Sequence, residues 1–185
     1  MTKTALHREL RELAPKLEMI PADRRMFEYK LGTSRLVRED DAASHIDVMM
    51  LIYDWESGEV LMGDHRKSGL WLVNGGHVEK EENLAEAVMR ELEEEMGWKI
   101  NQEKVGQPEF LTVCAIEANG YDCRRHYDIW FLIPVEKGEL KIDEEKMRTE
   151  FKEWGWFDMG TARKLKTSNN HFRVFDYLEK KLKEG

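Results

Sequence analysis

Apolar residues in the middle of the chain gather in several segments that have the length of β-strands. An unbroken apolar run over residues 48–53 has the length of a strand, and it predicts a strand that is buried on both faces. Other segments, bounded by turn signals such as Ser57-Gly58, predict five more strands, over residues 60–62, 70–73, 110–116, 126–135 and 150–158.

Two other segments follow the helical period. Residues 83–96 predict a helix with one apolar stripe, made of Leu84, Ala85, Val88, Leu92 and Met96. Near the end of the chain a second stripe, Phe172, Phe175, Leu178 and Leu182, predicts a C-terminal helix. Strands that alternate with two helices favour an α+β fold, in which helices cover both faces of a mixed β-sheet.

The first 43 residues have a different pattern of apolar and charged positions. Leu6, Leu10, Leu13 and Leu17 recur at helical spacing, and we expect Pro15 to end or kink that helix. Residues 24–41 are mixed and charged, and they predict no element. We therefore divide the chain into an N-terminal helical or irregular extension, residues 1–43, and a main domain, residues 44–185. The leucine stripe could serve a homodimer or cover its own domain, and the sequence leaves both open.

Charge and composition argue against some classes of binding partner. The net charge of the 185 residues is −8, which argues against nucleic acid or an anionic membrane as the partner. No apolar run reaches about 18 residues, so we expect no membrane span, and the charged N-terminus lacks the core of a signal peptide. The expected location is the cytoplasm.

The two cysteines flank a hairpin signal. Asn119-Gly120 is typical of a two-residue turn, and it would place Cys114 opposite Arg125 and Cys123 opposite Ile116. The two sulfur atoms would not face one another, so we expect two free thiols.

Candidate chemistry lies on the helix predicted over residues 83–96. Glu91, Glu94 and Glu95 fall in one arc beside the apolar stripe. A solvated acidic face would explain a bare run of glutamates, but like charges on one helix repel, and a divalent cation would reverse that effect. Gly75 and Gly76, which end the strand that precedes this helix, leave the backbone open to close approach by an ion or phosphate.

The segment from Gly76 to Trp98 resembles the Nudix box, G-x5-E-x7-R-E-U-x-E-E-x-G-U, where U is a bulky apolar residue. Its fixed positions are filled by Gly76, Glu82, Arg90, Glu91, Leu92, Glu94, Glu95, Gly97 and Trp98. Only Trp98 departs from the more usual aliphatic residue. The order of strands and helices from Ser44 to Gly185 also resembles the family, which implies a Nudix-type α/β/α sandwich.

The resemblance implies a metal-dependent hydrolase that cuts the diphosphate bond of a nucleoside diphosphate linked to another moiety. The cofactor would be Mg²⁺, with Mn²⁺ as an alternative, held by Glu94, Glu95 and the carbonyl of Gly76. Glu91 would bind a further ion or act as the base that activates water. Arg90 would orient the glutamates, and Glu82 would support the loop or a second ion.

Residues outside the box are weaker candidates. Arg66 and Lys67 could meet phosphate or form only a solvated basic loop. His126 and Asp128 alternate on one strand face and could line the site, and Trp130 could stack on a base, although a core tryptophan is more common. Glu150 could supply a ligand from beyond the box. Glu144 and Glu145 compete for that role.

Two other functions stay open. A Nudix-type domain can bind a nucleotide or regulate a partner without turnover, but such domains often lose box glutamates, which this chain retains. An isoprenoid diphosphate isomerase shares the fold, but it also needs a catalytic cysteine and metal-binding histidines. The contexts of Cys114 and Cys123 do not match that pattern.

Overall fold

The computed structural model describes residues 4–116 and 122–184, and its centre is one mixed β-sheet. The main strand order is β3-β2-β1-β6-β5, with β4 paired to β1 and β7 paired to β2. The strands are β1 Ser44–Asp54, β2 Val60–His65, β3 Trp71–Leu72, β4 Asn74–His77, β5 Phe110–Ala115, β6 Arg125–Val135 and β7 Phe151–Phe157. β1 and β6 run parallel, whereas the other pairs are antiparallel, so the predicted mixed sheet is confirmed.

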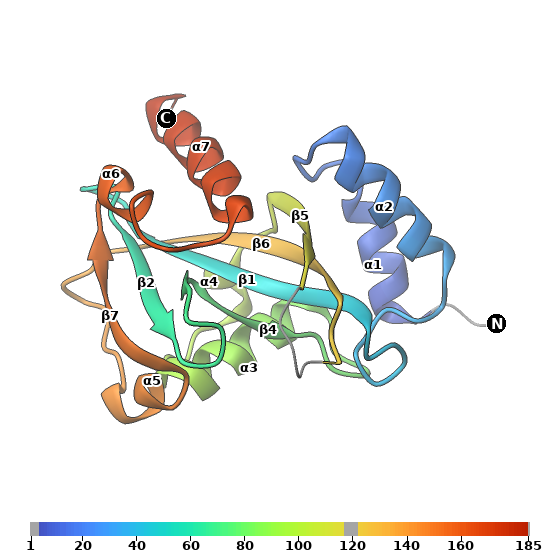
Figure 1. The fold of residues 1–185 in the computed structure, drawn as a ribbon, viewed down its shortest axis with the longest axis horizontal. Coiled ribbons are helices and arrows are strands. Elements are labelled where there is room, and N and C mark those ends of the chain that lie inside the picture. Colours follow the sequence, from blue (N-terminus) through green and yellow to red (C-terminus); the bar gives the residue numbers. More distant parts are fainter. Residues whose placement is uncertain (1–3, 117–121, 185) are drawn as a thin grey trace.

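Seven helices surround this sheet within the described residues. They are α1 Ala5–Leu13, α2 Pro21–Gly32, α3 Leu84–Met96, α4 Gln102–Val105, α5 Glu144–Glu150, α6 Met159–Ala162 and α7 Asn169–Glu184. Figure 1 shows α3 and α7 on opposite sides of β1 and β6, with α1 and α2 at the end of the molecule away from β7. No helix in the described ranges has both the length and the apolar content that crossing a membrane requires.

The central strand β1 is buried on both faces, as its unbroken apolar run predicts. Ile46, Val48 and Met50 belong to the apolar cluster that includes the inner stripe of α3. Leu51 and Tyr53 belong to a second cluster, which includes the inner stripe of α7. The sheet therefore separates two cores, and a residue's position along β1 or β6 decides which side it faces.

The N-terminal leucine stripe packs within its own chain. Leu6, Leu10, Leu13 and Leu17 are buried in the cluster that also contains residues of β1 and α3. α1 ends at Leu13, before Pro15, as expected from the ring's clash with a continuing helix. A homodimer would therefore have to use another surface. The division of the chain at residue 43 stays a prediction.

Several short elements were not predicted from the sequence, namely β4, α4, α5 and α6, and the longest element that was missed is the helix α2. α2 overlaps the first part of the charged segment and begins just before it, with Pro21 in its first turn. Its apolar periodicity is weak because two of its buried positions are charged. Asp23 pairs with Arg173 at 2.7 Å, and Lys30 pairs with Asp41 at 3.1 Å.

The hairpin register differs by one residue from the prediction. β5 and β6 pair Cys114 with His126, not with Arg125, and the backbone N–H of Ile116 donates to the carbonyl of Arg124. The predicted turn at Asn119-Gly120 lies outside the described residues. The side-chain assignment was wrong because a one-residue change in loop length shifts every pair along the hairpin. Both thiols are free, as expected.

Candidate active site

The helix α3 has well-defined ends, which fix the direction of its glutamates. At its start, the Asn83 side chain accepts a hydrogen bond from the backbone N–H of Glu86, and the Glu86 side chain accepts one from Asn83. At its end, Gly97 has a left-handed conformation with φ 69°, and its N–H donates to the carbonyl of Glu93. Left-handed backbone favours glycine, which explains its place just after the helix.

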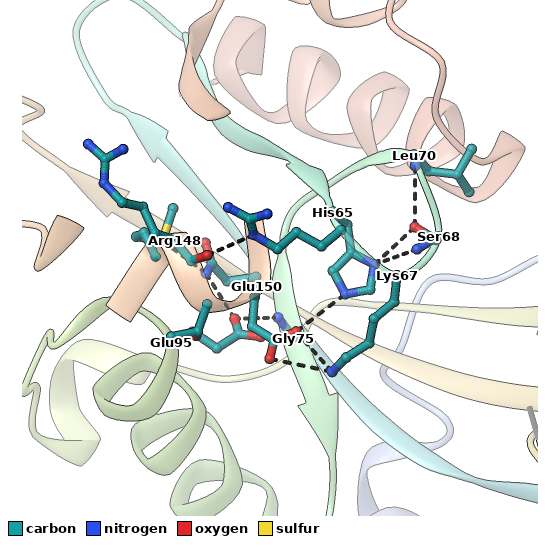
Figure 2. A network of polar contacts seen from close by, with 12 residues as sticks. His65, Lys67, Ser68, Leu70, Gly75, Glu95, Arg148 and Glu150 are labelled. Carbon is teal, nitrogen blue, oxygen red and sulfur yellow. Dashed lines mark hydrogen bonds and ion pairs between the residues drawn. The ribbon is translucent and has the colours of Figure 1, made fainter. Parts of the chain in front are cut away.

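Three glutamates of α3 line a pocket of about 180 Å³. Glu91, Glu94 and Glu95 form one side, while Thr149 and Glu150 at the end of α5 form the other. We call this the carboxylate pocket. Figure 2 shows Glu150 close to Glu95 and to the loop that follows β2. Of the three candidates beyond the box, Glu150 lines the pocket, whereas Glu144 and Glu145 are not among its lining residues. Glu144 pairs instead with Arg148 at 2.8 Å.

Gly76 lies directly against Glu91. It pairs with Val48 of β1, and a Cβ at this position would lie 2.1 Å from Oε1 of Glu91. That distance is far below van der Waals contact, so any side chain here would displace the carboxylate. The box glycine is thus explained by the need to bring β4 and α3 close together.

Among the three glutamates, Glu91 is the most buried, while Glu95 is partly exposed and is hydrogen-bonded to β4. Oε2 of Glu95 accepts hydrogen bonds from Nδ2 of Asn74 at 2.8 Å and from the backbone N–H of Gly75 at 3.3 Å. Burial raises the pKa of Glu95 to about 8 despite these bonds, and the nearby Glu91 adds to the rise. Burial also raises the pKa of Glu91, against the opposing effect of Arg90. Two carboxylates that resist ionisation in one pocket are suited to a partner of positive charge.

Arg90 ties the glutamates to the strand-to-helix loop. Its Nε and Nη2 donate to the two oxygens of Glu82 at 2.7 and 3.0 Å, and Nη2 also donates to the carbonyl of His77 at 2.8 Å. Nη1 donates to Glu91 at 2.7 Å and to Glu94 at 3.3 Å. The planar guanidinium therefore holds two box glutamates, one support residue and the backbone in a single arrangement.

The basic loop after β2 is joined to the end of α5. Nζ of Lys67 lies 3.1 Å from Oε2 of Glu150, and Nε2 of His65 lies 3.6 Å from the same atom. Nε of Arg66 donates to the carbonyl of Arg148 at 2.7 Å. The loop thus places Lys67 beside Glu150 at the edge of the carboxylate pocket (Figure 2), while the guanidinium of Arg66 binds the backbone of α5.

His126 and Asp128 lie on the other face of the sheet. On β6 they alternate with residues of the α3 side and share the face of Trp130, which belongs to the α7 core. Trp130 is 1% exposed and its indole N–H donates to Oγ1 of Thr112 at 2.9 Å, so it acts as a core residue. Trp71 makes an edge contact with Phe157 and is a packing residue as well.

Around His126 the structure gathers residues that the sequence did not single out. These are His45 and Asp47 of β1, His77 of β4, and Cys123 just before β6. Burial lowers the pKa of His77 to about 4. Burial also lowers the pKa of His126, but its contact with Asp47 outweighs this and leaves it at about 9, while burial raises the pKa of Asp128 to about 7. The available signal was the repeated His-x-Asp pattern of two strands, which pair in register as His45 with His126 and Asp47 with Asp128.

Comparison with known proteins shows the family. The family model of the NUDIX domain matches residues 43–178, which is most of the chain. Among solved structures, the dihydroneopterin triphosphate pyrophosphohydrolase of E. coli is similar, with 23% identity and a TM-score of 0.53 over 71% of this chain and 92% of that chain. The MutT protein of Methanosarcina mazei Go1 has 24% identity and a TM-score of 0.54 over 75% and 95%. An Ap4A hydrolase of C. elegans has 17% identity and a TM-score of 0.56 over 76% and 98%. The matched family model establishes that this chain belongs to the Nudix family, and these solved structures share its fold.

Proposed function

We propose that this protein is a metal-dependent pyrophosphohydrolase that cuts the diphosphate bond of a nucleoside diphosphate linked to another moiety. The observation that carries the proposal is the carboxylate pocket. There Glu91, Glu94, Glu95 and Glu150 converge beside a strand whose Gly76 has no space for a side chain. The substrate would be a small nucleotide-type molecule, and a cytoplasmic location stays a prediction.

The residues of the pocket fit a divalent cation. Mg²⁺ and Mn²⁺ prefer carboxylate and carbonyl oxygens, which are the donors that these glutamates and the backbone of Gly76 offer. The raised pKa values of Glu91 and Glu95 indicate that the carboxylates are poorly compensated by the protein alone. A carboxylate that ionises to bind a cation would gain that compensation.

Each group in the pocket would have its own role in the reaction. Glu94, Glu95 and the carbonyl of Gly76 would hold the cation. When bound, the cation would polarise phosphoryl oxygens and lower the pKa of a water molecule. Glu91 would accept the proton of the attacking water or bind a further ion. As water attacks one phosphorus, the bond from that phosphorus to the bridging oxygen breaks, and the departing phosphate takes the electron pair.

Charged neighbours would keep these groups in place. Arg90 would hold Glu91 and Glu94 through the contacts described above, with Glu82 supporting Arg90 from the loop. Lys67 lies at the rim of the pocket on Glu150 and would turn to the substrate's phosphate when it binds. Arg66 would bind phosphate only by leaving the carbonyl of Arg148.

The test is hydrolysis of a panel of diphosphates with Mg²⁺ or Mn²⁺, with and without a chelator. The panel contains nucleoside triphosphates, nucleotide sugars, dinucleoside polyphosphates, ADP-ribose and one isoprenoid diphosphate. We expect Glu91→Gln and Glu95→Gln to lower kcat by about 100-fold or more, because they remove a charge but keep the shape. Glu93→Gln is the matched control, since Glu93 is on the same helix and pairs with Lys99 on the surface.

The same panel separates the alternatives. Tight binding of a nucleotide without turnover on the whole panel would favour a binding or regulatory domain. Isomerisation of the isoprenoid diphosphate without hydrolysis would favour the isomerase. Turnover of any diphosphate that survives in both Glu91→Gln and Glu95→Gln would contradict the proposed roles.

A further inference from the structure

Three histidines and one cysteine meet on the sheet face opposite the carboxylate pocket. His45 comes from β1, His77 from β4 and His126 from β6, while Cys123 precedes β6. One donor atom from each lies within 4.8 Å of the others. We call this set the histidine–cysteine cluster. It has no part in the proposed hydrolysis.

The sheet itself brings these residues together. His45 pairs with His126 across the parallel β1–β6 ladder, and His77 pairs with Asp47 across the β1–β4 ladder. The ring centroids lie 4.7 Å apart for His45 and His77, and 4.9 Å apart for His45 and His126. Donors that are fixed on three hydrogen-bonded strands form a rigid site, in which little ordering is needed for a ligand to bind.

The donor atoms have the spacing of a tetrahedral zinc site. Sγ of Cys123 lies 3.6 Å from Nε2 of His45 and 4.0 Å from Nε2 of His77. In a tetrahedral site with ordinary Zn–N and Zn–S bonds, sulfur and nitrogen ligands are about 3.6 Å apart. The cluster is thus close to a zinc-binding geometry without any change in the backbone.

In two of the three histidines, His126 and His45, the other ring nitrogen is already held by an oxygen atom. Nδ1 of His126 lies 2.9 Å from Oδ2 of Asp47, and Nδ1 of His45 lies 3.0 Å from the carbonyl of Asp41. A metal-bound histidine commonly donates its second N–H to a carboxylate or a carbonyl, which fixes the tautomer and turns the free nitrogen toward the metal. Both histidines have this arrangement.

Two buried polar atoms at the cluster lack a hydrogen bond. Nε2 of His126 and Oδ1 of Asp47 are both inaccessible to solvent and have no hydrogen-bond partner in the described part of the chain. A cluster that was held only by hydrogen bonds would be expected to satisfy these atoms. A metal ion bound to Nε2 of His126 would give this nitrogen the partner that it lacks.

The charges also favour a cation. Asp47 and Asp128 are both about 95% buried, at 4% and 5% exposure, and both carboxylates lie within reach of His126. Two buried carboxylates beside one imidazole are poorly compensated. A dication bound by a thiolate and three neutral imidazoles carries one net positive charge, and it would replace the proton of His126 as the positive charge beside the two carboxylates.

We propose that His45, His77, His126 and Cys123 form a tetrahedral zinc site, with Asp47 as the carboxylate that orients His126. Zinc fits because nitrogen and sulfur donors select it over Mg²⁺, which prefers oxygen. Four protein ligands leave no open position, so the site stabilises the fold. It would also fix the end of β4, where His77 follows Gly76 and offers its carbonyl to Arg90.

The first test measures bound zinc on protein that carries no polyhistidine tag, in excess Mg²⁺ so that the carboxylate pocket is saturated. After zinc addition and gel filtration, we expect one equivalent in the wild type, in Cys114→Ser and in Glu95→Gln. We expect less than a tenth of an equivalent in the double variant Cys123→Ser/His126→Gln. Cys114→Ser is the matched control because Cys114 is the other thiol and lies outside the cluster. A wild type that retains no more zinc than the double variant would overturn the proposal.

Cobalt substitution tests the ligands. With Co²⁺, the wild type and Cys114→Ser should show the near-ultraviolet thiolate band and intense visible bands of a tetrahedral site, and Cys123→Ser should lose the thiolate band. Asp47→Asn should retain the site with about 10- to 100-fold weaker zinc affinity. An unchanged thiolate band in Cys123→Ser would refute the ligand set.

A third measurement needs no variant, so it holds even if the substituted proteins fail to fold. Zinc should slow the alkylation of Cys123 in the wild type by tenfold or more, as followed by mass spectrometry, while Cys114 in the same molecules reacts at an unchanged rate. Equal rates for Cys123 with and without zinc would contradict the proposal. Since none of these readouts uses hydrolysis, a failed zinc site and a failed hydrolase assignment can be told apart.

Discussion

Gly76 and Glu91 are packed so closely that the absence of a side chain on one is required for the position of the carboxylate on the other. A Cβ on Gly76 would lie 2.1 Å from Oε1 and 2.3 Å from Cδ of Glu91. Glu91 itself is fixed from the other side by Nη1 of Arg90. The strand and the helix therefore jointly define where this carboxylate lies.

Gly76→Ala should inactivate the enzyme more than it destabilises the fold. The added methyl group must push the Glu91 carboxylate away, and a displacement of about 1 Å in a catalytic group can lower turnover by about 100-fold. We expect a fall in kcat of that order with a modest decrease in Tm. Gly138→Ala is the control, because its Cβ would meet no atom within 4 Å among the described residues. Wild-type kcat in Gly76→Ala would show that Glu91 need not stay in place.

Arg90→Lys tests whether the fork of the guanidinium is needed. A lysine ammonium cannot reach Glu82, Glu91 and the carbonyl of His77 at once, whereas Arg90 contacts all three. We expect kcat to fall by about 10- to 100-fold and the Mg²⁺ concentration for half-maximal activity to rise. The readout is a metal titration at saturating substrate.

A surface arginine provides the comparison for that variant. Arg163 pairs with Asp176 and Glu179 near α7, so Arg163→Lys changes the same chemical group far from the carboxylate pocket. Its kcat and metal dependence should match those of the wild type. Equal behaviour of the two lysine variants would mean that charge alone is sufficient at position 90.

The box helix could be predicted because its information is local. Asn83, Gly97 and the apolar stripe between them define the ends and the buried face, and the phase of Glu91, Glu94 and Glu95 follows from those. Glu150 could be named only as one of three candidates. Its place depends on how α5 packs against α3, which is a contact between segments far apart in the sequence.

The parallel pairing of β1 with β6 could not be predicted for the same reason. It brings His45 beside His126 although the two strands are far apart in the sequence, and a register shifted by one residue would have separated them. α2 was missed because its buried Asp23 and Lys30 hide the helical period. In both cases the polar groups are buried because they pair with a residue from another part of the chain, and such a pair cannot be identified from the local sequence.

His171 should make the protein sensitive to mild acid. It is 2% exposed, its Nε2 accepts from the backbone N–H of Val73 at 3.4 Å, and its Nδ1 lies 2.8 Å from Oγ of Ser168. Burial lowers the pKa of His171 to about 3 from its ordinary value of 6.5. The unfolded chain therefore takes up the proton first, and stability falls as pH decreases below about 6.5.

The size of this effect follows from the linkage between protonation and folding. Between pH 6.5 and pH 5 this single group should remove about 2 kcal/mol from the free energy of unfolding. Urea denaturation at several pH values should give a shallower pH dependence for His171→Gln than for the wild type, whatever the variant's stability at pH 7.5. Parallel curves for the two proteins would show that His171 does not titrate as its burial predicts.

Glu9 links the N-terminal helix to the start of the helix that carries the box glutamates. Its Oε2 accepts a hydrogen bond of 3.2 Å from the backbone N–H of Leu84, in the first turn of α3, where unpaired N–H groups and the helix dipole favour a negative charge. Glu9→Ala should therefore lower the free energy of unfolding by about 1 kcal/mol. Glu12→Ala, an exposed change on the same helix, should have little effect. Chemical denaturation measures both, and equal losses in the two variants would mean that α1 stabilises α3 through its leucine stripe alone.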